Sequence, residues 1–476
     1  MKKVAAIVGG GVIGAGWLAR FLLNGWDVKV FDPDPEARRK VEEVLLNAKR
    51  ALPMLYDFKL PEEGSLYFCS TIQEAVEDAL WIQESVPERL DIKHAVLSEI
   101  QTYCQNIAVI GSSTSGFMPS QLQENSSFPE QIMVCHPFNP VYLLPLVEVV
   151  PGNLTSDEHC KSAKVLLHEV GFFPLHIRKE IDAHVADRFL EAVWREALWL
   201  IRDGVATTEE IDNAIRYGFG LRWAQMGLFE TYRVAGGEGG MAHFIEQFGP
   251  CLKWPWTKLM DVPELTKELI QDIADQSDSQ SGKYSIRELE RIRDNNLVVI
   301  LRALKQQDQA AGKIVNSHEE KIINLAEIAP IMRTVSRKVP VDWTDYNGHM
   351  NEGRYGQVYS DAADGFLWAV GADKAYVASG YSYFTVETSV KFLTETHAGQ
   401  DIIVDTTVKL IDGKKLKLFH SMQRAEDGCI LSTCEQFLLH IDMKKRKSSL
   451  PVSPVAQNLQ NLSKKNLRLV RICILD

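Results

Sequence analysis

Three glycines near the start of the chain, Gly9, Gly11 and Gly14, have the spacing G-x-G-x-x-G and lie between a short apolar run and an amphipathic stretch. A second apolar run follows and ends in the acid Asp32. The pattern predicts a strand, a glycine turn, a helix over about residues 13–24, a second strand and a carboxylate. This order is typical of a βαβ unit that binds a dinucleotide at the turn.

The residues of this unit have separate physical roles. Gly9 permits the tight turn, Gly11 lets the backbone approach a pyrophosphate, and Gly14 lets the helix pack closely on the strand. The pyrophosphate then meets the free N–H groups at the N-terminus of the helix. Asp32 can accept hydrogen bonds from both ribose hydroxyls and would repel a 2′-phosphate, so we expect the cofactor to be NAD rather than NADP.

The same segment could also begin a secretory signal peptide, because Lys2 and Lys3 precede an apolar run of small residues. A signal segment favours uninterrupted helix, however, and five glycines lie in the middle of this one: Gly9, Gly10, Gly11, Gly14 and Gly16. The second strand and its acid also have no place in a signal peptide. We therefore expect a cofactor site and no cleaved leader.

The composition narrows the class of protein. The chain has 476 residues, of which 45% are hydrophobic and 24% charged, and this length suits about three domains. The net charge of -11 argues against a general nucleic-acid or membrane-surface role. The eight cysteines are scattered without metal-ligand spacing, which favours reduced thiols, and no apolar run reaches the roughly 18 residues that span a membrane. We expect a cytoplasmic protein without a bound metal.

Residues 1–180 alternate short apolar strands with helical patterns, which predicts an α/β Rossmann domain with a doubly wound sheet. Beyond the first two strands, the candidate strands are residues 79–82, 107–111, 132–135 and 146–150. Long helical patterns follow and predict an all-α domain over 181–328. Within it we expect a threonine to cap the helix that opens residues 207–218, a polar loop over 275–285, and a further helix over 286–307.

The pattern changes again after about residue 329. Alternating patterns over 385–393, 401–412 and 415–424 predict strands, and a helical stretch before them reaches about Trp368. We expect a separate α+β domain over 329–447. The segment from Lys444 to Arg471 holds eight basic residues and no acids, and we expect the tail over 448–476 to be solvated or loosely docked.

A histidine and an asparagine, His136 and Asn139, stand three residues apart at the end of a predicted strand. Glu148 lies in or near the next strand, and Ser115 lies in a hydroxyl-rich turn after another strand. The carboxyl ends of strands face the ligand crevice in an open α/β sheet. Oxidation of an alcohol by NAD needs a base for the hydroxyl proton, and histidine suits that task. We expect His136 as base, Glu148 as its partner, and Ser115 and Asn139 at the substrate oxygen; a structural histidine is the alternative.

These motifs together resemble the 3-hydroxyacyl-CoA dehydrogenase superfamily over about residues 1–320. The resemblance implies a two-domain NAD-dependent dehydrogenase that usually dimerises through its helical domain, with His136 as base and Glu148 as its partner. It also implies that Glu88 and Lys93 line the cofactor site. The form H-P-F-N-P, followed by L-P-L-V-E-V-V-P-G, is more similar to the branch that acts on free hydroxy acids than to the branch that acts on CoA esters.

Two stretches depart from the superfamily where the substrate should bind. Asp187 stands where the motif G-F-x-x-N-R has asparagine, and the usual glycine-proline turn is absent from residues 220–244. A carboxylate near aromatic side chains suits a quaternary ammonium group. The candidate substrate residues are Asp187, Trp194, Trp223, Phe229 and Tyr232. Together with residues 194–224 these features resemble dehydrogenases of carnitine, which carries a trimethylammonium group; helix packing is the alternative for each aromatic side chain.

The segment D-x-N-G-H-M-N contains Asp345, His349 and Asn351 and opens a long helix that precedes an antiparallel sheet. Over about residues 333–445 the chain resembles the hotdog thioesterases of the 4-hydroxybenzoyl-CoA type. The resemblance implies that Asp345 attacks the thioester or activates water, while the N-terminal end of the helix polarises the carbonyl. His349 and Asn351 are expected to be structural. Hotdog domains generally act as dimers.

Together the two resemblances imply a bifunctional enzyme and a homodimer. Its substrates would be carnitine, oxidised with NAD to 3-dehydrocarnitine, and a short acyl-CoA, expected to be betainyl-CoA, hydrolysed to glycine betaine. One alternative is a 3-hydroxyacyl-CoA or other 3-hydroxy-acid dehydrogenase whose hotdog domain only binds acyl-CoA or dimerises. Another is a non-enzymatic NAD-binding protein, which has no need of the complete set Ser115, His136, Asn139 and Glu148.

Overall fold

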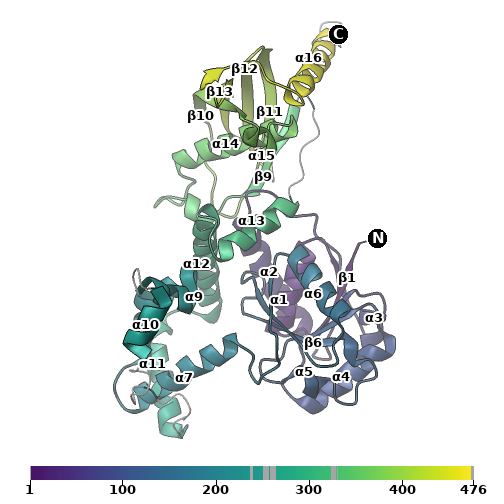
Figure 1. The fold of residues 1–476 in the computed structure, drawn as a ribbon, viewed down its shortest axis with the longest axis vertical. Coiled ribbons are helices and arrows are strands. Elements are labelled where there is room, and N and C mark those ends of the chain that lie inside the picture. Colours follow the sequence, from purple (N-terminus) through teal and green to yellow (C-terminus); the bar gives the residue numbers. More distant parts are fainter. Residues whose placement is uncertain are drawn as a thin grey trace. The chain divides into compact units, whose positions relative to one another are not determined.

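A computed structural model describes residues 2–235, 240–249, 257, 264–322, 329 and 331–472. The chain forms two compact units: unit 1 comprises residues 1–51 and 61–318, and unit 2 comprises residues 52–60 and 319–476. Each unit contains one β-sheet (Figure 1). The predicted domain boundaries at 180, 328 and 447 fall inside these units and stay predictions. None of the described helices is long and apolar enough to cross a membrane.

The sheet of unit 1 has eight strands in the order β3-β2-β1-β4-β5-β6-β7-β8. The strands are β1 (Val4–Val8), β2 (Asp27–Phe31), β3 (Leu66–Phe68), β4 (Trp81–Glu84), β5 (Val109–Ser112), β6 (Ile132–Pro137), β7 (Leu146–Pro151) and β8 (Phe173–His176). Neighbouring strands are parallel except β6 and β7, which are antiparallel. The strand order reverses between β1 and β4, which makes their carboxyl ends the point where such sheets bind ligands. The predicted α/β fold is confirmed.

The central strands of this sheet are apolar on both faces because helices cover them. Strands β4, β5 and β6 are buried along their whole length. The helices of this part are α1 (Val12–Leu23), α2 (Ala37–Ala51), α3 (Ile72–Val76), α4 (Leu90–Tyr103), α5 (Pro119–Leu122) and α6 (Asp157–Glu169). Thr71 and Ser156 cap α3 and α6 by accepting hydrogen bonds from amides three residues further on.

A run of helices follows β8. It comprises α7 (Ala186–Arg202), α8 (Thr208–Ala214), a π-helix (Ile215–Phe219), α9 (Gly220–Ala235), α10 (Gly240–Phe248), α11 (Lys267–Ser281), α12 (Ile286–Gln306) and α13 (Ala311–Ile322). Thr207 caps α8 through a capping box with Glu210, so the predicted threonine cap is confirmed.

The polar loop predicted over residues 275–285 is wrong for most of its length. Helix α11 continues through Ser281, and only a short turn separates it from Ser285, which caps α12. Most of the last turns of α11 are exposed to solvent. A solvated helix needs no apolar side on those turns, so its polar composition resembles that of a loop.

Unit 2 contains an antiparallel sheet in the order β10-β13-β12-β11-β9, with β14 beside β13. Its elements are β9 (Ile331–Lys338), α14 (Glu352–Ala369), α15 (Lys374–Ala378), β10 (Tyr381–Phe392), β11 (Asp401–Asp412), β12 (Lys415–Arg424), β13 (Ile430–Asp442) and β14 (Lys447–Ser448). Helix α14 contacts β9, β11 and β12 (Figure 1). Tyr359 and Phe366 of this helix are buried in the core against the sheet. The predicted α+β hotdog fold is confirmed.

The prediction of a solvated or loosely docked tail is wrong for its first part. Residues Val455–Ile472 form helix α16, and Val455, Leu459 and Leu462 are buried in the core of unit 2. Their spacing of four and three residues places them on one side of the helix. The basic charge of the segment hid this short apolar stripe.

Candidate active sites

The turn between β1 and α1 has the shape that a pyrophosphate requires. Gly9 has a φ angle of +101°, and a Cβ atom there would lie 2.5 Å from the carbonyl oxygen of Ser85. A Cβ atom at Gly14 would lie 1.9 Å from the carbonyl oxygen of Gly9, so only glycine lets the helix approach the turn. At Gly11 nothing lies within 4 Å of the Cβ position, which leaves open space beside the turn. The turn therefore fits NAD on its own geometry.

Asp32 follows β2 and is held beside the glycine turn. Its Oδ2 accepts a hydrogen bond of 2.6 Å from the amide of Gly10, and its Oδ1 accepts one of 2.8 Å from the amide of Asp34. These amides fix the carboxylate at the end of the second strand. This is the position from which an acid reaches the ribose hydroxyls of a dinucleotide.

A buried ion pair lies at the end of β4, close to the turn. Lys93 of α4 is 2.9 Å from Glu84, and both side chains are almost fully buried. Lys93 also lies 3.2 Å from the half-exposed carboxylate of Glu88. Burial raises the pKa of Glu88, but the hydrogen bonds from Thr114, Lys93 and the Gly116 amide outweigh burial and hold this pKa below its usual value.

Glu84 is part of this cluster, although the sequence pattern did not single it out. It also accepts a hydrogen bond from Ser112 on the neighbouring strand β5. The feature that could have indicated it is an acid at the end of a short buried strand, Trp81–Glu84. A carboxylate in that position needs a partner, because an unpaired buried charge is costly.

His136, Glu148 and Ser115 lie close together at one edge of the sheet. His136 on β6 and Glu148 on β7 are directly opposite each other in the antiparallel register. The Nδ1 atom of His136 is 3.1 Å from Glu148 Oε2, and its Nε2 atom is 3.2 Å from Ser115 Oγ. Because a carboxylate only accepts, Nδ1 carries the hydrogen and Nε2 is left with the lone pair.

Glu148 is fully buried and stays ionised. Its second oxygen, Oε1, accepts hydrogen bonds of 2.9 Å from the amides of Val185 and Ala186, at the start of α7. Burial raises the pKa of Glu148, but the hydrogen bonds from His136 and from these two amides outweigh burial and bring the pKa below its usual value. The carboxylate can therefore stabilise a positive charge on His136.

A second histidine, His184, lies beside His136 and was not predicted. It occupies the phenylalanine position of the motif G-F-x-x-N-R, and the two ring centres are 5.6 Å apart. Its Nε2 atom donates to the carbonyl of Thr114 at 3.1 Å, and its buried Nδ1 atom has no hydrogen-bond partner among the described residues. Burial lowers the pKa of His184, so the ring is neutral and Nδ1 is an acceptor.

Of the other candidate substrate residues that the structure describes, only Asp187 has an interaction with a residue of this site. The negative charge of Asp187 opposes the lowering of the His184 pKa by burial, so this carboxylate lies within electrostatic range of the site. Trp223 lies against Phe219 with ring centres 4.6 Å apart, and Tyr232 stacks on Phe244 at the same distance.

The remaining three candidates, Trp194, Phe229 and Asn139, have exposed side chains. A cation-binding role for the aromatic residues and a substrate contact for Asn139 stay predictions.

The second candidate site lies in the loop before α14. The amide of Asp345 donates to the carbonyl of His349 at 3.0 Å, which closes the loop. Asp345 Oδ1 accepts a hydrogen bond of 2.8 Å from the Asn347 amide, and Oδ2 has no such partner among the described residues. Asn351 caps α14 by accepting from the Gly353 amide at 3.0 Å. The loop thus presents one carboxylate oxygen next to the N-terminus of an 18-residue helix.

Comparison with known families gives three matches along the chain. Residues 4–181 match the NAD binding domain of 3-hydroxyacyl-CoA dehydrogenase, and residues 184–273 match its C-terminal domain. Residues 339–459 match the thioesterase-like superfamily. Among solved structures, a 5-formyl-3-hydroxy-2-methylpyridine 4-carboxylic acid 5-dehydrogenase is 26% identical with a TM-score of 0.55, covering 64% of this chain and 99% of that one. This likeness supports the dehydrogenase fold.

Two named relatives match most of this chain, and a third matches the dehydrogenase part. A protein of Ruegeria pomeroyi named L-carnitine dehydrogenase/betainyl-CoA thioesterase is 60% identical, over 94% of this chain and 93% of its own. A protein of the same name from Agrobacterium fabrum is 55% identical over 94% of this chain and 92% of its own. A Mesorhizobium japonicum protein named L-carnitine dehydrogenase is 58% identical over 69% of this chain and 92% of its own. The chain therefore belongs to the family of L-carnitine dehydrogenase/betainyl-CoA thioesterases, in which an NAD-dependent dehydrogenase is joined to a thioesterase-like domain.

Proposed function

We propose that this chain oxidises L-carnitine to 3-dehydrocarnitine at its first site and hydrolyses betainyl-CoA to glycine betaine at its second. The observation that carries the proposal is the 60% identity over 94% of the chain to a relative named for both activities. The geometry of the two sites supports it. A base with an ionised partner lies at the cofactor-binding edge of one sheet, and a carboxylate lies at the N-terminus of a helix on the other.

In the first reaction, His136 removes the hydroxyl proton of the substrate through Nε2. Ser115, within 3.2 Å of that nitrogen, donates a hydrogen bond to the substrate oxygen and helps to place it. NAD, which the glycine turn and Asp32 would hold, would accept the hydride from the carbon that bears this hydroxyl group. Glu148 keeps the hydrogen on Nδ1 and stabilises the imidazolium that forms, so the lone pair of Nε2 is available for the substrate proton.

The substrate cation is held by charge and aromatic faces. A trimethylammonium group cannot donate an ordinary hydrogen bond, so the carboxylate of Asp187 and the aromatic side chains of α9 are the groups that can recognise it. His184 offers a neutral acceptor, Nδ1, for the substrate hydroxyl or for a bound water. Phenylalanine, which the superfamily motif has at this position, offers no such acceptor.

In the second reaction, the free oxygen of Asp345 attacks the thioester carbonyl or activates a water molecule. The N-terminus of α14 stabilises the negative charge that develops on the carbonyl oxygen, because its amides and the helix dipole point toward the loop. Asp345 belongs to unit 2 and His136 to unit 1, so the two chemistries reside in separate parts of the chain.

A homodimer is the assembly that the second unit favours. Strand β10 is the edge strand of its sheet, and most of its residues are exposed. Among them, Phe384, Val386 and Phe392 are more than half exposed. A long apolar edge strand is a template for pairing with another chain, so we propose that two copies pair along β10.

A cytoplasmic location also stays a proposal. The six cysteines in the described part of the chain are free thiols, which suits a reducing compartment.

Replacement of His136 by alanine should lower carnitine oxidation by at least about 100-fold, because general-base catalysis is lost. Binding of NAD should be unchanged, since the hydrogen bonds of the His136 ring go to Ser115 and Glu148 and not to the glycine turn. Glu148→Gln should impair the same step by mispositioning the imidazole. Steady-state kinetics and NAD titration by fluorescence would measure the two effects. His176→Ala, at an exposed histidine on β8, is the matched control; normal turnover in the His136 variant would require another base.

The substrate cation can be tested with a neutral analogue in which a tert-butyl group replaces trimethylammonium. The native enzyme should prefer carnitine, since each cation–π contact contributes about 0.5–2 kcal/mol. Asp187→Asn and Trp223→Ala should each reduce kcat/KM for carnitine by roughly ten-fold and leave the analogue unaffected. Tyr67→Ala, at an exposed aromatic residue of β3, serves as control. Equal efficiency of the native enzyme on both compounds would exclude carnitine as the selected substrate.

Asp345→Asn should reduce hydrolysis of betainyl-CoA by at least about 100-fold while carnitine oxidation persists. The amide keeps the size of the side chain but cannot attack a thioester or take a proton. Release of free CoA, measured with a thiol reagent, would report the effect. Asp412→Asn, at an exposed acid at the end of β11, should hydrolyse normally. Retained hydrolysis in the Asp345 variant would remove this carboxylate from the mechanism.

Val386→Lys should convert the dimer to a monomer, because a charged side chain on an edge strand opposes pairing. Sedimentation velocity would give the oligomeric state. Ile107→Lys places the same charge on an exposed apolar residue of unit 1 and should leave the dimer intact. A dimer that persists in the Val386 variant would place the interface elsewhere.

A further inference from the structure

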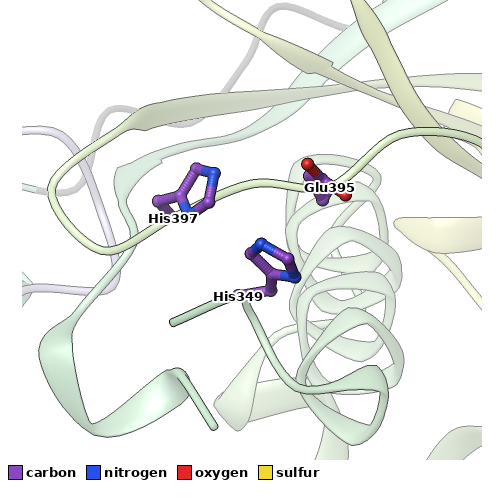
Figure 2. Close-up of side chains that lie close together, drawn as sticks. All are labelled: His349, Glu395 and His397. Carbon is purple, nitrogen blue, oxygen red and sulfur yellow. The ribbon is translucent and has the colours of Figure 1, made fainter. Parts of the chain in front are cut away.

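Three side chains that can ligate a metal ion meet at the surface of unit 2. The nearest ligand atoms of His349, Glu395 and His397 all lie within 4.8 Å of one another. His349 lies in the loop before α14, and the other two lie in the loop after β10. Figure 2 shows the three side chains close together, with Glu395 and His397 on one loop and His349 on the other.

Backbone pairing holds the two loops together at this point. His349 and His397 form an isolated antiparallel bridge, and the amide of Met350 donates to the carbonyl of Thr396 at 2.8 Å. The rings of the two histidines are in edge-to-face contact with centres 4.8 Å apart. The backbone therefore brings the two imidazoles side by side without help from a ligand.

The hydrogen bonding of His397 fixes the tautomer that a metal needs. Its Nδ1 atom is 3.1 Å from the carbonyl oxygen of Gly348, which can only accept. Nδ1 thus carries the hydrogen, and Nε2 is left with a lone pair. Histidines that ligate metals usually donate their other ring N–H to a backbone carbonyl or carboxylate in this way.

The other two groups have no competing partners in the part of the chain that the structure describes. The carboxylate of Glu395 forms no ion pair there, and neither ring nitrogen of His349 forms a hydrogen bond. Arg424 donates a hydrogen bond of 3.3 Å to the backbone carbonyl of Glu395 rather than to its carboxylate. Two imidazoles and one carboxylate are left available in one place.

We propose that His349, Glu395 and His397 bind a divalent transition-metal ion of the Zn²⁺ class. Two imidazole nitrogens select such an ion over Mg²⁺ and Ca²⁺, which prefer oxygen ligands. Zinc ligands lie about 2.0–2.2 Å from the metal, so the three atoms must move closer together than they are here. The exposed side chains of Glu395 and His397 have room to do so. Three protein ligands leave a fourth position for water.

The site is linked to the loop that carries Asp345. The carbonyl of His349 accepts the hydrogen bond from the Asp345 amide at 3.0 Å, and Thr344 pairs with Met350. A metal ion bound to His349 would hold both strands of this loop. The consequence for catalysis rests on the proposed thioesterase function, whereas metal binding itself does not.

The test is direct metal binding to the intact chain after treatment with a chelator. Titration with Zn²⁺ by calorimetry should give one ion per chain, and Co²⁺ in its place should give the visible absorption of a tetrahedral or five-coordinate ion without a thiolate charge-transfer band. His397→Ala should weaken binding by at least about 100-fold, and Glu395→Gln by at least about ten-fold. Both residues are exposed, so the variants should fold, as circular dichroism would verify.

Two control variants separate this site from adventitious binding. His176→Ala and Glu426→Gln remove exposed side chains of the same types elsewhere and should leave the affinity unchanged. Zn²⁺ should also slow hydrogen exchange of the amides in residues 345–350 in the native chain only. A dissociation constant weaker than about 1 mM, unchanged affinity in His397→Ala, or a cobalt spectrum with thiolate ligation would each overturn the proposal. None of these measurements depends on thioester hydrolysis.

Discussion

The dehydrogenase site depends on the hydrogen bonds that the buried carboxylate of Glu148 accepts. One of its oxygens accepts from His136 across the antiparallel pair β6–β7, and the other accepts from the amides of Val185 and Ala186. The same group thus orients His136, the proposed base, and attaches the start of α7 to the sheet. Removing one member of a buried charged network typically costs about 3–5 kcal/mol, because the remaining polar groups lose their partners. Catalysis and the placement of the helical part are therefore connected through one side chain.

The strand order of the sheet explains why the glycine turn, Glu84, Ser115 and the pair His136–Glu148 lie near one another. Parallel strands bring their carboxyl ends to one edge of the sheet, and β1, β4 and β5 contribute the glycine turn, Glu84 and the segment leading to Ser115. Strand β7 runs in the opposite direction, so Glu148 must pair with His136 from the middle of its strand rather than from its end. That single antiparallel pairing places acid and base in direct register.

Features that depend on local sequence could be predicted, and features that depend on distant partners could not. The glycine turn follows from the spacing of residues within one βαβ unit. The pair His136–Glu148 follows from the spacing of residues on two strands that are consecutive in the sequence. His184 could not be predicted, because its hydrogen-bond partner Thr114 lies 70 residues away in the sequence. What makes His184 notable is its Nδ1 atom, which is buried and has no hydrogen-bond partner among the described residues. The cluster at His349 escaped notice for the same reason, since its ligands come from two separate loops. The errors at α11 and α16 have another cause: polar or basic composition hid helices whose side chains face solvent or bury one narrow stripe.

Three histidines of this chain show how the second hydrogen bond of an imidazole sets its chemistry. His136 donates to an ionised carboxylate, which stabilises a positive ring and leaves Nε2 with the lone pair that the proposed base needs. His184 donates to a backbone carbonyl in a buried position, and burial keeps the ring neutral, so its free nitrogen can only accept a hydrogen bond. His397 also donates to a carbonyl, but it is exposed and lies beside a second imidazole and a carboxylate, which is the environment of a metal ligand. The residue type is the same in each case; the partner on the other nitrogen and the exposure of the ring determine whether the ring is suited to move a proton, to accept a hydrogen bond or to bind a cation.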